Sequence, residues 1–359
     1  MSCLARRLSG HEGYGKEQNA VKIAILHCGY EPWPNEHRFL SDSFTEEIAA
    51  GYIERNVDKN IRMLAEAGES GADLAVTNED FGAIGSFLWD TARPGRFAEL
   101  VRKTEPAIAA RVADVSKKYG MMIAANEYCE SDGAIYNMTK LYGRDGALIG
   151  TQKKIHIPAL EGMVIRGGGE PSVFETDIGV IGVAICYDIN FPEVFRALAL
   201  KGADLILYQT MGWGLGGKCE PAVGEAMVRT RAVENSVYFV VAKSIGDGMS
   251  CVIDNYGNFI AKAAGLEERV LYADFTPDYM MEDEYNYDNF FAGVTSTRAR
   301  LMSVRVPKAY GVLTDDKPPV TDKFKGVKLA APEETRERIR RRDAMDKSEL
   351  SLYSWGRSE

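Results

Sequence analysis

Apolar residues along the chain alternate between strand-like and helix-like spacing from residue 21 onward. The segments 21–26 and 179–185 are continuous apolar runs with β-branched residues, which is typical of strands buried on both faces. Other stretches place apolar residues every three or four positions, as on one face of a helix. One such stripe is Ile53, Val57, Ile61, Leu64 and Ala65. The sequence therefore mixes buried strands with amphipathic helices.

The same spacing predicts further elements along the chain. Two strands form a hairpin around Asp145-Gly146, and helices cover about 192–201 and 223–235. A second long helix runs from Leu100 to Val115, and we expect Pro106 to interrupt it. The remaining strands are predicted at 74–76, 121–125, 135–142, 147–151, 205–209, 238–243, 251–254 and 270–275. This alternation of strands and helices favours an α/β layered fold.

A single cysteine stands at one strand-to-helix turn. Cys186 follows the buried strand 179–185, and Pro192 opens the next helix. Backbone N–H groups and the positive end of a helix would lower the thiol pKa there and favour the nucleophilic thiolate. The alternative is a small hydrophobic residue at the end of a core strand. The turn alone does not decide between these interpretations.

Two charged segments are candidate partners for this cysteine. Glu79 follows the strand 74–76, at the carboxyl end where ligands bind in open α/β sheets. Lys154 and His156 are predicted on one face of a strand, with Lys153 on the other. Taken singly, each charge is more typical of a solvated surface.

In the order Glu79, Lys154, Cys186, these elements resemble the nitrilase superfamily of carbon–nitrogen hydrolases, in its amidase or N-carbamoyl-amine hydrolase branch. The resemblance spans about 21–275 and implies a four-layer α–β–β–α sandwich in one domain. Its motifs are Tyr136-Asn137, Asp145-Gly146, Lys154-Ile155-His156-Ile157-Pro158, Gly182-Val183-Ala184-Ile185-Cys186-Tyr187-Asp188, Phe191-Pro192-Glu193, Arg196, Gly202-Ala203-Asp204, Arg231-Ala232-Val233-Glu234-Asn235 and Asp254-Asn255-Tyr256-Gly257.

The resemblance also implies roles for individual residues. Glu79 is the general base, Lys154 the oxyanion stabiliser and Cys186 the nucleophile; Lys154 is preferred to Lys153 because only it meets the family's Lys-x-His pattern. Glu161 matches a further family carboxylate, and the backbone N–H near Tyr187 is a second oxyanion donor.

Further residues are candidates for the substrate pocket. For His156 a structural hydrogen-bonding role is the preferred interpretation, Trp213 is equally typical of a loop anchor, and Arg166 is a candidate partner for a substrate carboxylate. The pocket candidates are Asn137, His156, Arg166 and Trp213.

The chain departs from the family pattern on either side of Glu79. Asn78 stands where the family usually has proline, and Asp80 after the glutamate is also unusual. A second carboxylate so close can raise one of the two pKa values. We expect Asp80 to be a helix N-cap or a solvated turn residue.

The activity implied is hydrolysis of a linear amide or N-carbamoyl amine through a cysteine thioester, releasing ammonia or an amine. Tyr187-Asp188 stands where true nitrilases place tryptophan and glutamate, so a nitrilase is the second hypothesis. A catalytically silent assembly or binding subunit is a third, from a different class. No metal or organic cofactor is expected.

Composition narrows the remaining possibilities. A net charge of −9 argues against broad nucleic-acid binding, and no apolar run approaches the roughly 18 residues of a membrane helix. Six scattered cysteines and four isolated histidines give no zinc pattern and suit a reducing cytoplasm. The resemblance implies small-molecule amides as partners, and composition favours neither nucleic acid nor a membrane.

Three regions are expected. Residues 1–20 form a flexible N-terminal arm without a secretory signal, and 21–275 form the hydrolase domain. Residues 276–359 are a C-terminal extension with acidic–aromatic and arginine-rich parts. We expect it to contact a partner subunit in a homodimer or larger homo-oligomer; a surface-packed tail is the alternative.

Overall fold

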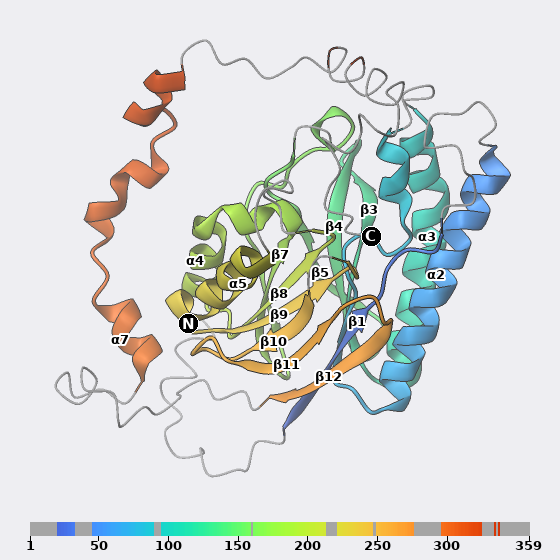
Figure 1. Cartoon of the computed structure of the whole chain (residues 1–359), viewed down its shortest axis with the longest axis horizontal. Helices are drawn as coiled ribbons and strands as arrows, with labels where there is room; N and C mark the ends of the chain where they lie inside the picture. The colour runs from blue at the N-terminus through green and yellow to red at the C-terminus, as the bar shows by residue number, and fades with distance from the viewer. Residues whose placement is uncertain are drawn as a thin grey trace.

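The computed structural model describes residues 20–32, 45–89, 95–158, 161–212, 221–246, 249–275 and 296–324, with 334 and 337. Within these residues two six-stranded sheets lie between two helical layers (Figure 1). The predicted four-layer α–β–β–α sandwich is confirmed. No helix among the described residues is long and apolar enough to cross a membrane. Trp213, the acidic–aromatic segment 278–289 and nearly all of the N-terminal arm lie outside the described residues.

The two sheets share one plan, with parallel strands in the centre and antiparallel strands at the edges. The first sheet has the order β12 (Arg269–Phe275), β1 (Val21–His27), β2 (Leu74–Val76), β3 (Met122–Ser131), β4 (Ala134–Tyr142), β5 (Leu148–Lys153). The second has the order β11 (Phe259–Ala264), β10 (Met249–Ile253), β9 (Tyr238–Lys243), β8 (Leu205–Thr210), β7 (Gly179–Ile185), β6 (Val173–Thr176). The parallel strands are β1, β2 and β3 in the first sheet and β7, β8 and β9 in the second.

Helices cover the outer face of each sheet. Figure 1 shows α2 (Glu46–Glu69) and α3 (Arg96–Tyr119) on the side of the first sheet, and α4 (Pro192–Leu200) and α5 (Pro221–Asn235) on the side of the second. Buried apolar residues form one core under α2 and α3, one between the sheets and one under α4 and α5. Because the central strands face apolar layers on both sides, they read as continuous apolar runs.

Helix α3 corrects one expectation, because it continues through Pro106 without interruption. The buried Leu100, Val101, Ile108 and Val112 hold both halves of the helix against the first sheet. Pro106 lies on the exposed side, so water can satisfy the carbonyl that loses its partner. Tertiary packing therefore outweighs the local preference of proline.

Short helices complete the structure. Three of them lie beside the sheets, namely η1 (Ile84–Trp89), η2 (Glu161–Met163) and η3 (Cys186–Asn190). The C-terminal segment contains α7 (Thr297–Ser303), η4 (Pro307–Thr314) and η5 (Pro319–Phe324), and in Figure 1 it runs apart from the sheets on the side of α4. The guanidinium of Arg298 joins α7 to the domain, 2.9 Å from Asp204 Oδ1.

Candidate active site

The ends of strands in the two sheets bring the predicted residues together. Glu79 lies three residues after β2, and Cys186 follows β7 directly. Lys154 follows the antiparallel strand β5, one residue past the strand on which we expected it. Its backbone N–H still donates to the carbonyl of Asn137 on β4, 2.8 Å away. Each side chain is therefore set by a strand end in the core.

Lys154 is fully buried between two carboxylates. Its Nζ lies 3.1 Å from Glu79 Oε1 and 2.8 Å from Glu161 Oε2. Burial lowers the pKa of Lys154, but its electrostatic interactions with Cys186, Glu79 and Glu161 outweigh burial and hold the pKa well above its usual range. The lysine is thus a permanent cation. Burial also raises the pKa of Glu161, while Lys154 opposes that rise.

The carboxylate of Glu79 is held by hydrogen bonds from three directions. Oε1 accepts from Asn137 Nδ2 at 2.8 Å as well as from Lys154, and Oε2 accepts from the backbone N–H of Met211 at 2.9 Å. Within the described residues, Oε2 accepts from Met211 alone, so it keeps a lone pair for another proton. Glu79 is 1% exposed and has a fixed orientation.

Cys186 is the first residue of η3 and has a positive φ of 46°. Such a backbone is costly for a residue other than glycine and is found where a site requires it. Tyr208 donates a hydrogen bond to the Cys186 carbonyl at 2.9 Å, and the side chain of Thr210 hydrogen-bonds to the thiol. The turn thus places the half-buried Cys186 at the strand end.

The predicted lowering of the Cys186 pKa is wrong. Burial and the negative charge of Glu79 raise it to about 12, although Lys154 acts in the opposite direction. The five-residue η3 provides too little dipole to overcome desolvation. The resting form of Cys186 is therefore the thiol, and a nucleophilic role requires a base.

The four pocket candidates have different positions. Asn137 is buried and faces Glu79, so it orients the carboxylate. His156 donates from its backbone N–H to Asp188 Oδ1 at 2.9 Å, contacts the same oxygen through Nδ1 and stacks on Phe191 at 3.5 Å between ring centroids. Arg166 is exposed, and its guanidinium pairs with no carboxylate in the described part of the chain. The structure does not describe Trp213.

Several contacts in the site were not predicted from the sequence. The Met211 N–H donates to Glu79 from just beyond β8, and the Thr210 side chain at the end of β8 hydrogen-bonds to the Cys186 thiol; the sequence marks this region only as a strand. Asp188 joins the cysteine turn to the lysine segment, since it accepts from Ile185 and from His156. Tyr187 packs edge-on against Phe191 at 5.8 Å and is partly exposed.

Asp80 caps η1 from a buried position. Its carboxylate accepts from the backbone N–H groups of Ile84 at 2.9 Å and Gly85 at 2.7 Å. Its side chain thus binds the first N–H groups of η1, although Asp80 lies four residues before Ile84 and not at the N-cap position, and at 1% exposed it is not a solvated turn residue. Burial raises the pKa of Asp80 to about 7, and the neighbouring Glu79 adds to the rise. Asn78 binds the Cys28 carbonyl and Ser244 Oγ, which ties the approach to Glu79 to the core.

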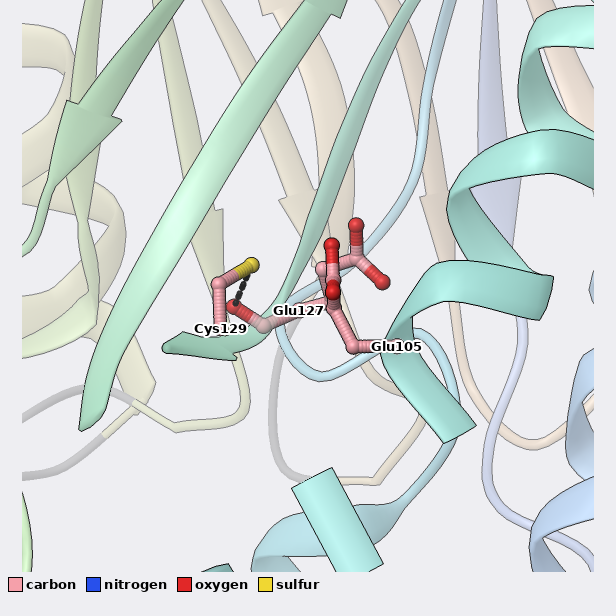
Figure 2. A group of neighbouring side chains, drawn as sticks. All are labelled: Glu105, Glu127 and Cys129. Atoms are coloured by element: carbon pink, nitrogen blue, oxygen red, sulfur yellow. Dashed lines mark hydrogen bonds between the residues drawn. The ribbon is translucent and has the colours of Figure 1, made fainter. Parts of the chain in front are cut away.

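A second buried polar cluster lies between β3 and α3. Figure 2 shows Glu105 from the helix facing Glu127 and Cys129 from the strand, and their ligand atoms all lie within 4.8 Å of one another. The ammonium of Lys140 contacts Glu105 and lies 2.9 Å from Glu127 Oε1. The lysine therefore occupies the position of a cation between the two carboxylates.

Two face-to-face sheets with an acid, a lysine and a cysteine at their strand ends define this fold as that of the nitrilase superfamily. The chain belongs to the carbon-nitrogen hydrolase family, whose model matches residues 47–285. The resemblance drawn from the motifs is confirmed.

Curated relatives and solved structures agree with this assignment. The omega-amidase NIT2 of Xenopus tropicalis is 29% identical over 67% of this chain and 90% of its own length, and that of Danio rerio is 31% identical over 63% and 84%. An amidase from Nesterenkonia sp. has the same fold, with a TM-score of 0.58 at 22% identity over 78% of this chain and 98% of the amidase. A mutant of that amidase in complex with butyramide gives a TM-score of 0.59 at 21% identity over 78% and 99%.

Proposed function

We propose that this protein hydrolyses the carbon–nitrogen bond of a small linear amide or N-carbamoyl amine through a thioester on Cys186. One observation carries the proposal: a buried lysine lies 3.1 Å from the carboxylate of Glu79, and both interact electrostatically with the Cys186 thiol. This arrangement provides an acid–base group, a fixed cation and a nucleophile in one place. The omega-amidase names of the relatives support an amide substrate.

The first half of the reaction begins with a proton transfer. Since the pKa of Cys186 is about 12, Glu79 removes the thiol proton through Oε2 as the sulfur attacks the substrate carbon. The ammonium of Lys154 and the backbone N–H near Tyr187 stabilise the tetrahedral oxyanion. Glu79 then delivers the proton to the leaving nitrogen, and ammonia or an amine departs.

The second half regenerates the enzyme. Glu79 accepts a proton from water as the water attacks the thioester, and the same proton returns to the sulfur when the acid leaves. Glu161 contributes by its position 2.8 Å from Lys154 Nζ, where it holds the cation in place and can orient the water. Asn137 keeps Glu79 oriented in both halves.

Mass spectrometry of Cys186 tests the proposal. Wild-type protein is mixed with a panel of linear amides, N-carbamoyl amines and nitriles, and both the ammonia released and the mass added to the Cys186 peptide are measured. We expect a thioester adduct and ammonia from an amide, and neither from Cys186→Ala. Turnover by Cys186→Ala within tenfold of wild type would refute the nucleophile, turnover of nitriles alone would favour a nitrilase, and no adduct from the whole panel would favour a silent subunit.

We also propose that the protein is a homodimer or larger homo-oligomer. Apolar side chains line the C-terminal segment, and Val304, Val312 and Leu313 are each more than half exposed. A groove of about 900 Å³ separates this segment from α4. A second copy of the chain would cover these residues. Sedimentation equilibrium of wild type and Leu313→Glu tests this, and a monomeric wild type would overturn it.

A further inference from the structure

Lys243 is a buried cation that the proposed mechanism leaves unused. It is the last residue of β9, is 1% exposed and pairs in register with Thr210 at the end of β8. A buried ammonium is costly unless hydrogen bonds compensate it. The groups that Lys243 contacts therefore indicate what the residue does.

The ammonium of Lys243 binds the residue that holds the general base. Its Nζ donates to the carbonyl of Met211 at 3.3 Å and to its neighbour Ser244's carbonyl at 3.1 Å. The backbone N–H of the same Met211 donates to Glu79 Oε2 at 2.9 Å. One peptide group of Met211 thus faces the lysine while the other faces the carboxylate.

The backbone around Lys243 is fixed, so its side chain has a defined origin. Its N–H donates to Ser250 Oγ at 3.1 Å, and the serine hydroxyl donates back to the Lys243 carbonyl at the same distance. The N–H of Ser244 donates to the Thr210 carbonyl at 3.1 Å. Strand β9 is therefore attached to the end of β8, beside the threonine that hydrogen-bonds to the Cys186 thiol.

We infer that Lys243 is a positioning residue for proton transfer between Cys186 and Glu79. Its ammonium holds the Met211 carbonyl and so fixes the Met211 backbone. The Met211 N–H then orients Oε2 of the general base toward the thiol. This inference rests on the proposed function of Glu79 and Cys186. Lys243 acts through Met211.

Alkylation of Cys186 by 2-chloroacetamide tests the inference, with the adduct on the Cys186 peptide followed by mass spectrometry. The reagent reports how readily the thiol loses its proton and requires no knowledge of the natural substrate. For Lys243→Met we expect alkylation at pH 7 about tenfold slower than in wild type, from the loss of one charge-assisted hydrogen bond. Lys243→Arg keeps a cation, and its rate should stay within about threefold of wild type.

Lys140→Met is the matched control, because Lys140 is also a buried strand lysine but lies in the Glu105–Glu127 cluster. We expect it to lower the melting temperature while changing Cys186 alkylation by less than about twofold. If Lys243→Met does not fold, Lys243→Gln replaces it. The inference is overturned if folded Lys243→Met or Lys243→Gln has Cys186 alkylated at the wild-type rate. It is also overturned if Lys140→Met slows Cys186 alkylation as much as the Lys243 variant does.

The proposed function has a separate readout. If Cys186→Ala still hydrolyses amides, the nucleophile assignment fails regardless of the Lys243 result. If the alkylation rates differ as expected but no amide is hydrolysed, the positioning role stands and the substrate class is wrong. For any amide that is hydrolysed, Lys243→Met should lower kcat about tenfold and leave KM within about threefold.

Discussion

Replacing Lys154 by methionine should reduce both stability and catalysis, for reasons that can be separated. The ammonium lies 3.1 Å from Glu79 Oε1 and 2.8 Å from Glu161 Oε2, and the lysine is fully buried. Removing one partner of a buried ion pair costs about 3–5 kcal/mol, since the remaining charge is left without compensation. Here two carboxylates lose the same cation, so we expect a loss of about 4 kcal/mol in the free energy of unfolding at pH 8.

The loss should depend on pH, and the sign follows from Glu161. Burial raises its pKa above the usual 4.5 and Lys154 lowers it, so the variant should have a still higher Glu161 pKa. A carboxyl whose pKa is raised on folding is protonated more strongly in the folded state, so stability falls as the pH rises above 4.5. The destabilisation by Lys154→Met should therefore be smaller at pH 5 than at pH 8.

Urea denaturation followed by circular dichroism at both pH values measures this difference. The double variant Lys154→Met/Glu161→Gln removes one uncompensated carboxylate and should recover much of the stability at pH 8. It should not recover turnover, which we expect to stay at least about 100-fold below wild type because the cation proposed to stabilise the oxyanion is missing. Equal destabilisation at pH 5 and pH 8, or recovery of turnover in the double variant, would contradict this account of Lys154.

Three further predictions concern other parts of the molecule. Glu79→Gln has two opposing effects on Cys186: it removes a negative charge that raises the pKa of the thiol, and it removes the proposed base. If Glu79 is the base, chloroacetamide should modify Cys186 at pH 7 more slowly in this variant than in wild type. Faster modification would contradict that role. Burial raises the pKa of Asp80 from 3.8 to about 7, so the folded state favours the protonated carboxyl and wild-type stability falls between pH 4 and pH 7. Asp80→Asn should reduce that fall. An unchanged pH profile of the free energy of unfolding in urea denaturation would speak against this. Gly146→Ala should lower the free energy of unfolding by about 2 kcal/mol or more, because φ of Gly146 is +82° and the new Cβ would lie 2.6 Å from the Ala113 carbonyl oxygen. A melting temperature equal to that of wild type would exclude this strain.

Strands with a strong local signal were predicted from the sequence better than strands that depend on their neighbours. The strand 179–185 and the hairpin around Asp145-Gly146 coincide with β7 and with β4–β5, because burial on both faces and a turn glycine leave clear local signals. The edge strands β6 and β11 were missed, since they are short and half-exposed and depend on a neighbouring strand. A local sequence pattern carries no information about which strand will pair with it.

The residues of the candidate site also differ in how well the sequence predicted them. The positions of Glu79, Lys154 and Cys186 follow from motifs, because each lies at or near the end of a strand with a recognisable pattern. The contributions of Met211 and Lys243 depend on a backbone N–H and on the pairing of β8 with β9. Any residue can supply a backbone N–H, so no sequence pattern marks the donor. Asn137 was assigned to the pocket because a motif gives proximity and not orientation.

The wrong prediction for the Cys186 thiol clarifies what the site must do. A helix terminus favours the thiolate by a modest amount, whereas burial beside Glu79 raises the pKa of Cys186 to about 12. Such a thiol is protonated at neutral pH and is protected from casual oxidation, since the thiolate is the reactive form. In the proposed mechanism, reactivity then requires that the proton moves to Oε2 of Glu79 while the substrate is present. The fixed orientation of Glu79, with Asn137 and Lys154 on one oxygen and Met211 on the other, is the structural condition for that transfer.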